Sequence, residues 1–151
     1  MTAPEGLGWA SLTVWFVVNA VNVLQSVGFA SRPSKGMVVN HRLGIVIALL
    51  AIPAAVALVS FVRVDSAQWV GPAVFVVFVV LMLIVDYITP VEFRSPRRPG
   101  LLIPYLVLFF GSILLMGAPM FWLNRGLWLV TVVTTAALLA AMVWAIRTGH
   151  G

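Results

Sequence analysis

The amino-acid sequence predicts an all-α integral membrane protein, folded as a compact bundle of five transmembrane helices. Hydrophobic residues make up 62% of the 151 residues and charged residues only 9%, whereas charged residues average about 25% in soluble proteins. The long apolar runs each have about 20 residues, the length that a helix needs to cross about 30 Å of hydrocarbon. Ten-residue segments of alternating polarity, typical of membrane-spanning β-strands, are absent from the sequence.

Five spans are expected within a single polytopic membrane domain of residues 1–151, at 8–30, 43–64, 69–88, 101–118 and 127–146. The first span ends in a small-residue pattern that could be mistaken for a signal-peptide cleavage site. We interpret it as a retained first helix, because the leader carries Glu5 and no lysine or arginine, and amide residues interrupt the apolar run.

Basic residues are distributed unequally over the alternate loops. The first and third loops and the C-terminal tail hold seven of the nine lysines and arginines: Arg32, Lys35, Arg42, Arg94, Arg97, Arg98 and Arg147. The other side holds Arg63 and Arg125. The positive-inside rule therefore predicts a multi-pass protein of the cell membrane with its N-terminus outside and its C-terminus in the cytoplasm. Most of the net charge of +5 belongs to this signal, and no motif indicates a nucleic-acid partner.

The residues that usually carry chemistry are scarce. There is no cysteine, only two histidines and only four carboxylates, which excludes disulfides and thiolate metal centres and leaves too few ligands for a di-iron site or bis-histidine haem. No nucleotide-binding glycine loop, G-x-S-x-G or H-E-x-x-H motif occurs. We therefore expect no metal, no cofactor and no catalytic residue, and the balance is against an enzyme.

The first span carries a polar helix face. Small and amide residues recur there at spacings of three and four, and its main members are Asn19, Asn22, Gln25 and Ser26. Such residues hold membrane helices together through close approach and interhelical hydrogen bonds. The alternative is a polar lining for a substrate, ion or quinone pathway. We favour the packing seam, because none of these side chains is ionisable.

A polar segment, residues 86–100, lies between two apolar runs and is expected at the inner membrane surface. Asp86 is the one acid set within an apolar run. A carboxylate there is costly unless it is paired, and arginine can bind it through two parallel hydrogen bonds. The expected inner-face polar cluster consists of His41, Arg42, Asp86, Glu92, Arg94, Arg97 and Arg98. Its excess of positive charge favours membrane lipids with anionic headgroups as partners.

Two local expectations complete the interpretation. Residues 31–42, which contain proline and glycine, are expected to form an inner loop. The third span is bulky and β-branched over residues 74–85 and shows no seam of small residues. We therefore expect it to face lipid or a large partner.

Three classes of function fit these features. The preferred one is a non-catalytic subunit or accessory protein of a membrane complex, because ionisable residues inside the spans are almost absent. The first alternative is a small oligomeric transporter or channel whose first helix lines the path. The second alternative is an inner-face lipid-binding protein or lipid-modifying enzyme that uses the inner-face polar cluster. A homo-oligomer or a larger membrane complex is expected.

Overall fold

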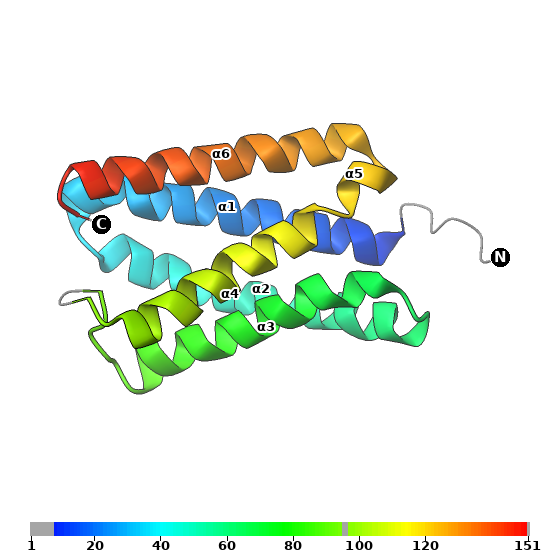
Figure 1. The fold of residues 1–151 in the computed structure, drawn as a ribbon, viewed down its shortest axis with the longest axis horizontal. Helices are drawn as coiled ribbons and strands as arrows, with labels where there is room; N and C mark the ends of the chain where they lie inside the picture. Colours follow the sequence, from blue (N-terminus) through cyan, green and yellow to red (C-terminus); the bar gives the residue numbers. More distant parts are fainter. Residues whose placement is uncertain (1–7, 95–96, 151) are drawn as a thin grey trace.

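The computed structural model describes residues 8–94 and 97–150, so Glu5 of the leader lies outside the described residues. Five helical segments there are long and apolar enough to cross a membrane, and the described residues contain no strand. The helical elements are α1 (Trp9–Lys35), α2 (Val38–Arg63), η1 (Ala67–Trp69), α3 (Val70–Leu83), a π-helical turn η2 (Ile84–Ile88), α4 (Pro99–Gly117), α5 (Met120–Leu123) and α6 (Arg125–Arg147). In Figure 1 the long helices run roughly along the long axis of the bundle, with α4 at a slant to the others. The predicted number and type of the long helices are confirmed.

The predicted loop at residues 31–42 is wrong. Helix α1 continues to Lys35 and α2 begins at Val38, so only a short turn at Gly36 separates them. Gly36 has a φ of 60°, in the left-handed region that glycine adopts without a Cβ clash. Its N–H donates to the Arg32 carbonyl at 2.9 Å, which ends α1. Pro33 lies inside the last turn of α1, where it removes the backbone donor that would bond to the Phe29 carbonyl, and the helix ends two residues later.

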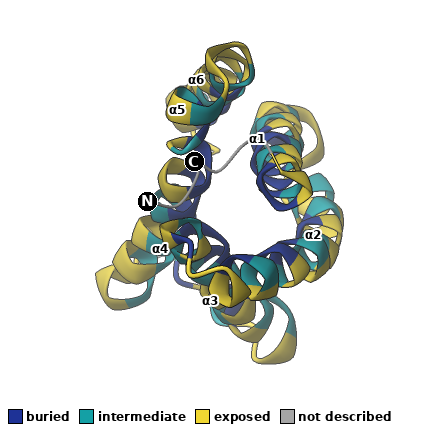
Figure 2. Cartoon of the chain, turned by 90° about the vertical axis from the view of Figure 1, so that its right-hand side faces the viewer, coloured by how far each residue is buried: buried dark blue, intermediate teal, exposed yellow. Residues whose placement is uncertain are grey.

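The helices follow one another around the bundle in the order α6, α1, α2, α3 and α4, and α1 also contacts α4 (Figure 2). The hydrophobic core lies where α1, α2, α3 and α4 face each other. Its fully buried members include Val17, Val18, Val21, Ile47, Ala54, Ala57, Phe75 and Phe78. Helix α6 packs mainly against α1 and adds Leu138 to the core, while most of its surface stays exposed.

Helix α3 does not face mainly outward, so the expectation from its bulky composition is wrong. It packs between α2 and α4, and its aromatic side chains supply much of the core: the rings of Phe78 and Phe109 lie 5.2 Å apart. Near the start of α3, a Cβ on Gly71 would lie 2.8 Å from the backbone of Leu115. Helices α3 and α4 therefore approach closely at one glycine, and aromatic rings fill the rest of their interface. A search for repeated small residues does not detect this kind of packing.

The turns divide between two ends of the bundle. The α1–α2 turn, the segment after η2 and the C-terminal end of α6 lie at one end, and the start of α1 and helix α5 lie at the other (Figure 1). The first of these ends carries the basic residues of residues 31–42, of the segment 89–98 and of the last turn of α6. We call it the basic end.

Candidate functional site

A π-helical turn positions Asp86 and Tyr87 at the basic end. The backbone N–H of Thr89 donates to the carbonyl of Ile84 at 2.8 Å, five residues earlier. Proline follows at position 90 and disfavours helical geometry at Thr89, so the helix ends there. The two neighbouring side chains then contact different parts of the bundle: Asp86 bonds to Tyr105 of α4, and Tyr87 bonds to α2.

Asp86 is held by two other residues, and we call the three of them the Asp86 clamp. The Nη1 and Nη2 atoms of Arg94 donate to Oδ1 and Oδ2 of Asp86 at 2.8 and 3.1 Å, and the Tyr105 hydroxyl donates to Oδ2 at 3.2 Å. The Arg94 guanidinium also lies 4.3 Å from the ring centroid of Phe93. Burial lowers the pKa of Arg94, but its hydrogen bond to Asp86 and the nearby charges raise the pKa overall. Arg94 therefore stays charged, and both oxygens of the Asp86 carboxylate accept hydrogen bonds.

The other members of the predicted inner-face cluster do not join this clamp. The side chains of Arg42, Glu92, Arg97 and Arg98 are exposed, and within residues 8–94 and 97–150 the ion pair is Arg94 with Asp86. The exposed His41 lies apart, its ring stacked on that of Tyr87 at 4.4 Å. The Tyr87 hydroxyl donates to the His41 carbonyl. Both Asp86 oxygens are already engaged, and an exposed ion pair gains at most about 1 kcal/mol, so nothing draws the remaining arginines inward.

Arg32 is a buried residue at the basic end, although the sequence predicted a basic residue in an inner loop. Only 7% of its surface is exposed. Its Nε donates to Asn40 Oδ1 and its Nη1 to the His150 carbonyl, both at 3.2 Å, and its guanidinium lies 4.1 Å from the centroid of the Phe29 ring. Gly28 makes room for Asn40, since a Cβ there would lie 2.8 Å from Asn40 Nδ2. A glycine one turn before an arginine near a helix end was the available signal.

The polar face of α1 is closed by threonines of α6, and we call this contact the α1–α6 seam. Asn19 Nδ2 donates to Thr131 Oγ1 at 3.1 Å, and Thr134 Oγ1 donates to Asn19 Oδ1 at 2.7 Å. Asn22 Nδ2 donates to Thr134 Oγ1 at 3.1 Å and to Thr135 Oγ1 at 2.9 Å. The amides of this face could be identified from the sequence, but the threonines that bind them were not predicted. The signal was three threonines at positions i, i+3 and i+4 of an apolar span.

The rest of the polar face has smaller roles. Trp15 Nε1 donates to the Leu127 carbonyl at 2.9 Å and so extends the seam toward the start of α6. Ser26 Oγ donates to the Asn22 carbonyl of its own helix at 2.7 Å, and Gln25 is half-buried. Asn22 Oδ1 is buried without a hydrogen-bond partner in the part of the chain that the structure describes.

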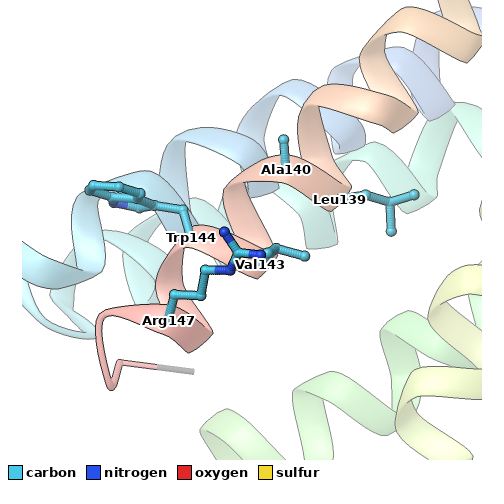
Figure 3. A pocket seen from close by; sticks show the side chains of 5 residues that line it. All are labelled: Leu139, Ala140, Val143, Trp144 and Arg147. Atoms are coloured by element: carbon cyan, nitrogen blue, oxygen red, sulfur yellow. The ribbon is translucent and has the colours of Figure 1, made fainter.

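Two open surface grooves lie near the basic end. One, of about 350 Å³, is on α6 and is lined by Leu139, Ala140, Val143, Trp144 and Arg147 (Figure 3). The other, of about 390 Å³, is lined by Met37, Val38, His41 and Arg42. Neither lining combines a nucleophile with an acid–base partner. No group of three histidine or acidic side chains suited to a metal ion occurs among the residues described.

Comparison with known proteins gives no match: the chain matches no protein-family model, no curated protein and no solved structure. Its function is therefore inferred from the α1–α6 seam, the Asp86 clamp and the buried Arg32.

Proposed function

We propose that this chain is a multi-pass protein of the cell membrane that serves as a non-catalytic subunit or accessory protein of a membrane complex. The observation that carries the proposal is the α1–α6 seam. A transport path through the bundle needs polar groups that face an open passage. Here the amides of Asn19 and Asn22 bond to threonines of the neighbouring helix instead.

The Asp86 clamp supports the same function. A carboxylate that acts as a general base or binds a substrate needs a free oxygen lone pair directed at the reacting group. Both oxygens of Asp86 accept hydrogen bonds from Arg94, and one of them also accepts from Tyr105. This arrangement suits a structural tie between the segment after η2 and helix α4.

The surface available for assembly is apolar. Helix α6 packs mainly on one neighbour and exposes large side chains along its length, including Leu129, Val130, Val133, Trp144 and Ile146. In a membrane such a face contacts lipid tails or the helices of another subunit. A second copy of this chain or a different membrane protein can both be accommodated there.

The proposed orientation places the basic end in the cytoplasm and the N-terminus outside, as the positive-inside rule requires. The chain has no cysteine, so single cysteines can be introduced without background labelling. Ser34→Cys is exposed at the basic end, and Val64→Cys is exposed at the other end. In intact cells a membrane-impermeant thiol reagent should label only Val64→Cys, and labelling of Ser34→Cys alone would reverse the orientation.

The subunit function is tested by gentle extraction of the tagged chain from its native membrane, followed by native mass spectrometry. We expect a complex in which the 16.3 kDa chain occurs with another polypeptide or with further copies of itself at a fixed ratio. The control is the same chain expressed alone in a foreign membrane, which separates self-association from hetero-assembly. A monomer that moves a solute across vesicles, or that turns over a lipid, would contradict the proposal.

A further inference from the structure

We propose that Arg32 forms a binding site for a phosphate group at the basic end of the bundle. The starting observation is a buried arginine that forms no ion pair with a carboxylate of the described residues. Arg32 is 7% exposed, and within residues 8–94 and 97–150 no carboxylate lies within 4.0 Å of it. Burying a guanidinium is costly unless an acid or an anionic ligand compensates for its charge.

The groups around Arg32 position it without neutralising it. Asn40 of α2 and the carbonyl of His150, beyond the end of α6, each accept one of its hydrogen bonds. The ring of Phe29, one turn earlier in α1, lies against the face of the guanidinium. Three parts of the chain thus hold the side chain in place, which lowers the entropy cost of binding a ligand.

The guanidinium keeps donor capacity for a ligand. Arginine has five N–H donors in a planar fork that matches the oxygen spacing of phosphate. Two of its nitrogens, Nε and Nη1, donate to the acceptors on Asn40 and His150. A phosphate is therefore a better fit than a halide or another spherical anion, because it accepts parallel hydrogen bonds.

The surrounding charges favour an anion. Asp86, the acid of the Asp86 clamp, is already bound by Arg94. The positive charge of Arg94 acts unfavourably on that of Arg32. An anion at Arg32 would relieve this repulsion as well as supply the missing counter-charge.

The phosphate has two possible sources, an anionic phospholipid headgroup and free inorganic phosphate. The lipid source depends on the membrane placement proposed above, whereas the site itself depends only on the contacts of Arg32. The purified chain in zwitterionic detergent is titrated with short-chain phosphatidylglycerol, with phosphatidylcholine of the same chain length, and with inorganic phosphate. The midpoint of thermal unfolding is recorded, because a ligand of the folded state raises it in a saturable manner.

For a headgroup site, phosphatidylglycerol should raise the midpoint in a saturable manner and phosphatidylcholine should raise it much less. For a free-phosphate site, inorganic phosphate should act without lipid. In either case Arg32→Gln should weaken the apparent affinity at least tenfold. The matched control is Lys35→Gln, an exposed cation in the same turn of α1, which should change the affinity less than twofold.

If Arg32→Gln and Lys35→Gln weakened the apparent affinity equally, the ligand would be held by general charge attraction, and the proposed site would be wrong. Equal stabilisation of wild type by all three ligands, or by none, would overturn it too. If Arg32→Gln does not fold, Arg32→Lys keeps the charge and loses the fork, and it should still bind the effective ligand several-fold more weakly. Wild-type affinity in Arg32→Lys would exclude the site. Because the titration uses the isolated chain, its outcome is independent of whether the chain assembles into a complex.

Discussion

The Asp86 clamp provides the most direct test of how a charged group is stabilised in this apolar bundle. The perturbation is Asp86→Asn, which keeps the shape of the side chain and removes its charge. Arg94 then remains in the same surroundings, against the rings of Phe93 and Tyr105, without its acid. The folded state should lose stability because a partly buried cation becomes unpaired.

The magnitude follows from the burial of the pair. Removing one partner of a fully buried ion pair costs about 3–5 kcal/mol, whereas an exposed pair contributes about 0.2–1 kcal/mol. The side chains of Arg94 and Asp86 are 31% and 18% exposed, which places the clamp between these limits. We expect Asp86→Asn to cost about 2 kcal/mol. Tyr105→Phe, which removes one hydrogen bond to the carboxylate, should cost about 1 kcal/mol.

The assay is equilibrium unfolding in mixed micelles, followed by tryptophan fluorescence. A double-mutant cycle with Asp86→Asn and Arg94→Gln should give a coupling free energy of about 1 kcal/mol or more. The control is Glu92→Gln, an exposed acid of the same segment, which should change the free energy of unfolding by less than about 0.5 kcal/mol. Additive effects in the cycle, with Asp86→Asn no worse than Glu92→Gln, would refute the reasoning.

Three further predictions concern packing, and each is checked by the thermal unfolding midpoint in detergent. Replacing both Asn19 and Asn22 with leucine removes the hydrogen bonds of the α1–α6 seam and should lower the midpoint, and an unchanged midpoint would argue against the seam. Gly71→Ala places a Cβ against the α4 backbone and should be strongly destabilising, whereas Gly111→Ala, which meets no atom within 4 Å, should be neutral or stabilising. Gly36→Ala should cost about 1 kcal/mol because its backbone is left-handed, and a neutral effect would show that the turn rearranges.

The number of long helices and the pairing of Asp86 with an arginine could be predicted from the sequence by general rules. Length and hydropathy identify the spans, because hydrocarbon imposes one minimum length on every helix. Which arginine binds Asp86 could not be predicted, since Arg94, Arg97 and Arg98 all lie within reach along the chain. The choice of Arg94 depends on the fold: Phe93 is fully buried beside it and anchors that part of the segment against Tyr105.

Two other features were hidden for physical reasons. Arg32 matches the ordinary pattern of a cation near the end of a span, and its burial arises only when α2 and the residues after α6 pack around it. The extra helical turns between residues 31 and 42 were hidden because a proline and a glycine usually indicate a loop. Here Pro33 falls in a last helical turn, and the single left-handed residue Gly36 is enough to reverse the chain.

The attachment of α6 to the bundle depends on polar contacts more than on its apolar surface. Leaving lipid for the surface of another helix gives apolar side chains little free energy, because lipid tails are equally apolar. An interhelical hydrogen bond in a membrane contributes only about 0.6 kcal/mol on average, because the polar groups of the separated helices find other partners. If α6 separated from α1 in a membrane, any amide group of Asn19 or Asn22 that found no other partner would be unsatisfied in hydrocarbon, at a cost of several kilocalories. The closed seam is therefore favoured mainly by the cost of opening it. Most of the hydrogen bonds between the side chains of α1 and α6 involve Asn19 and Asn22, so these two residues carry most of that cost.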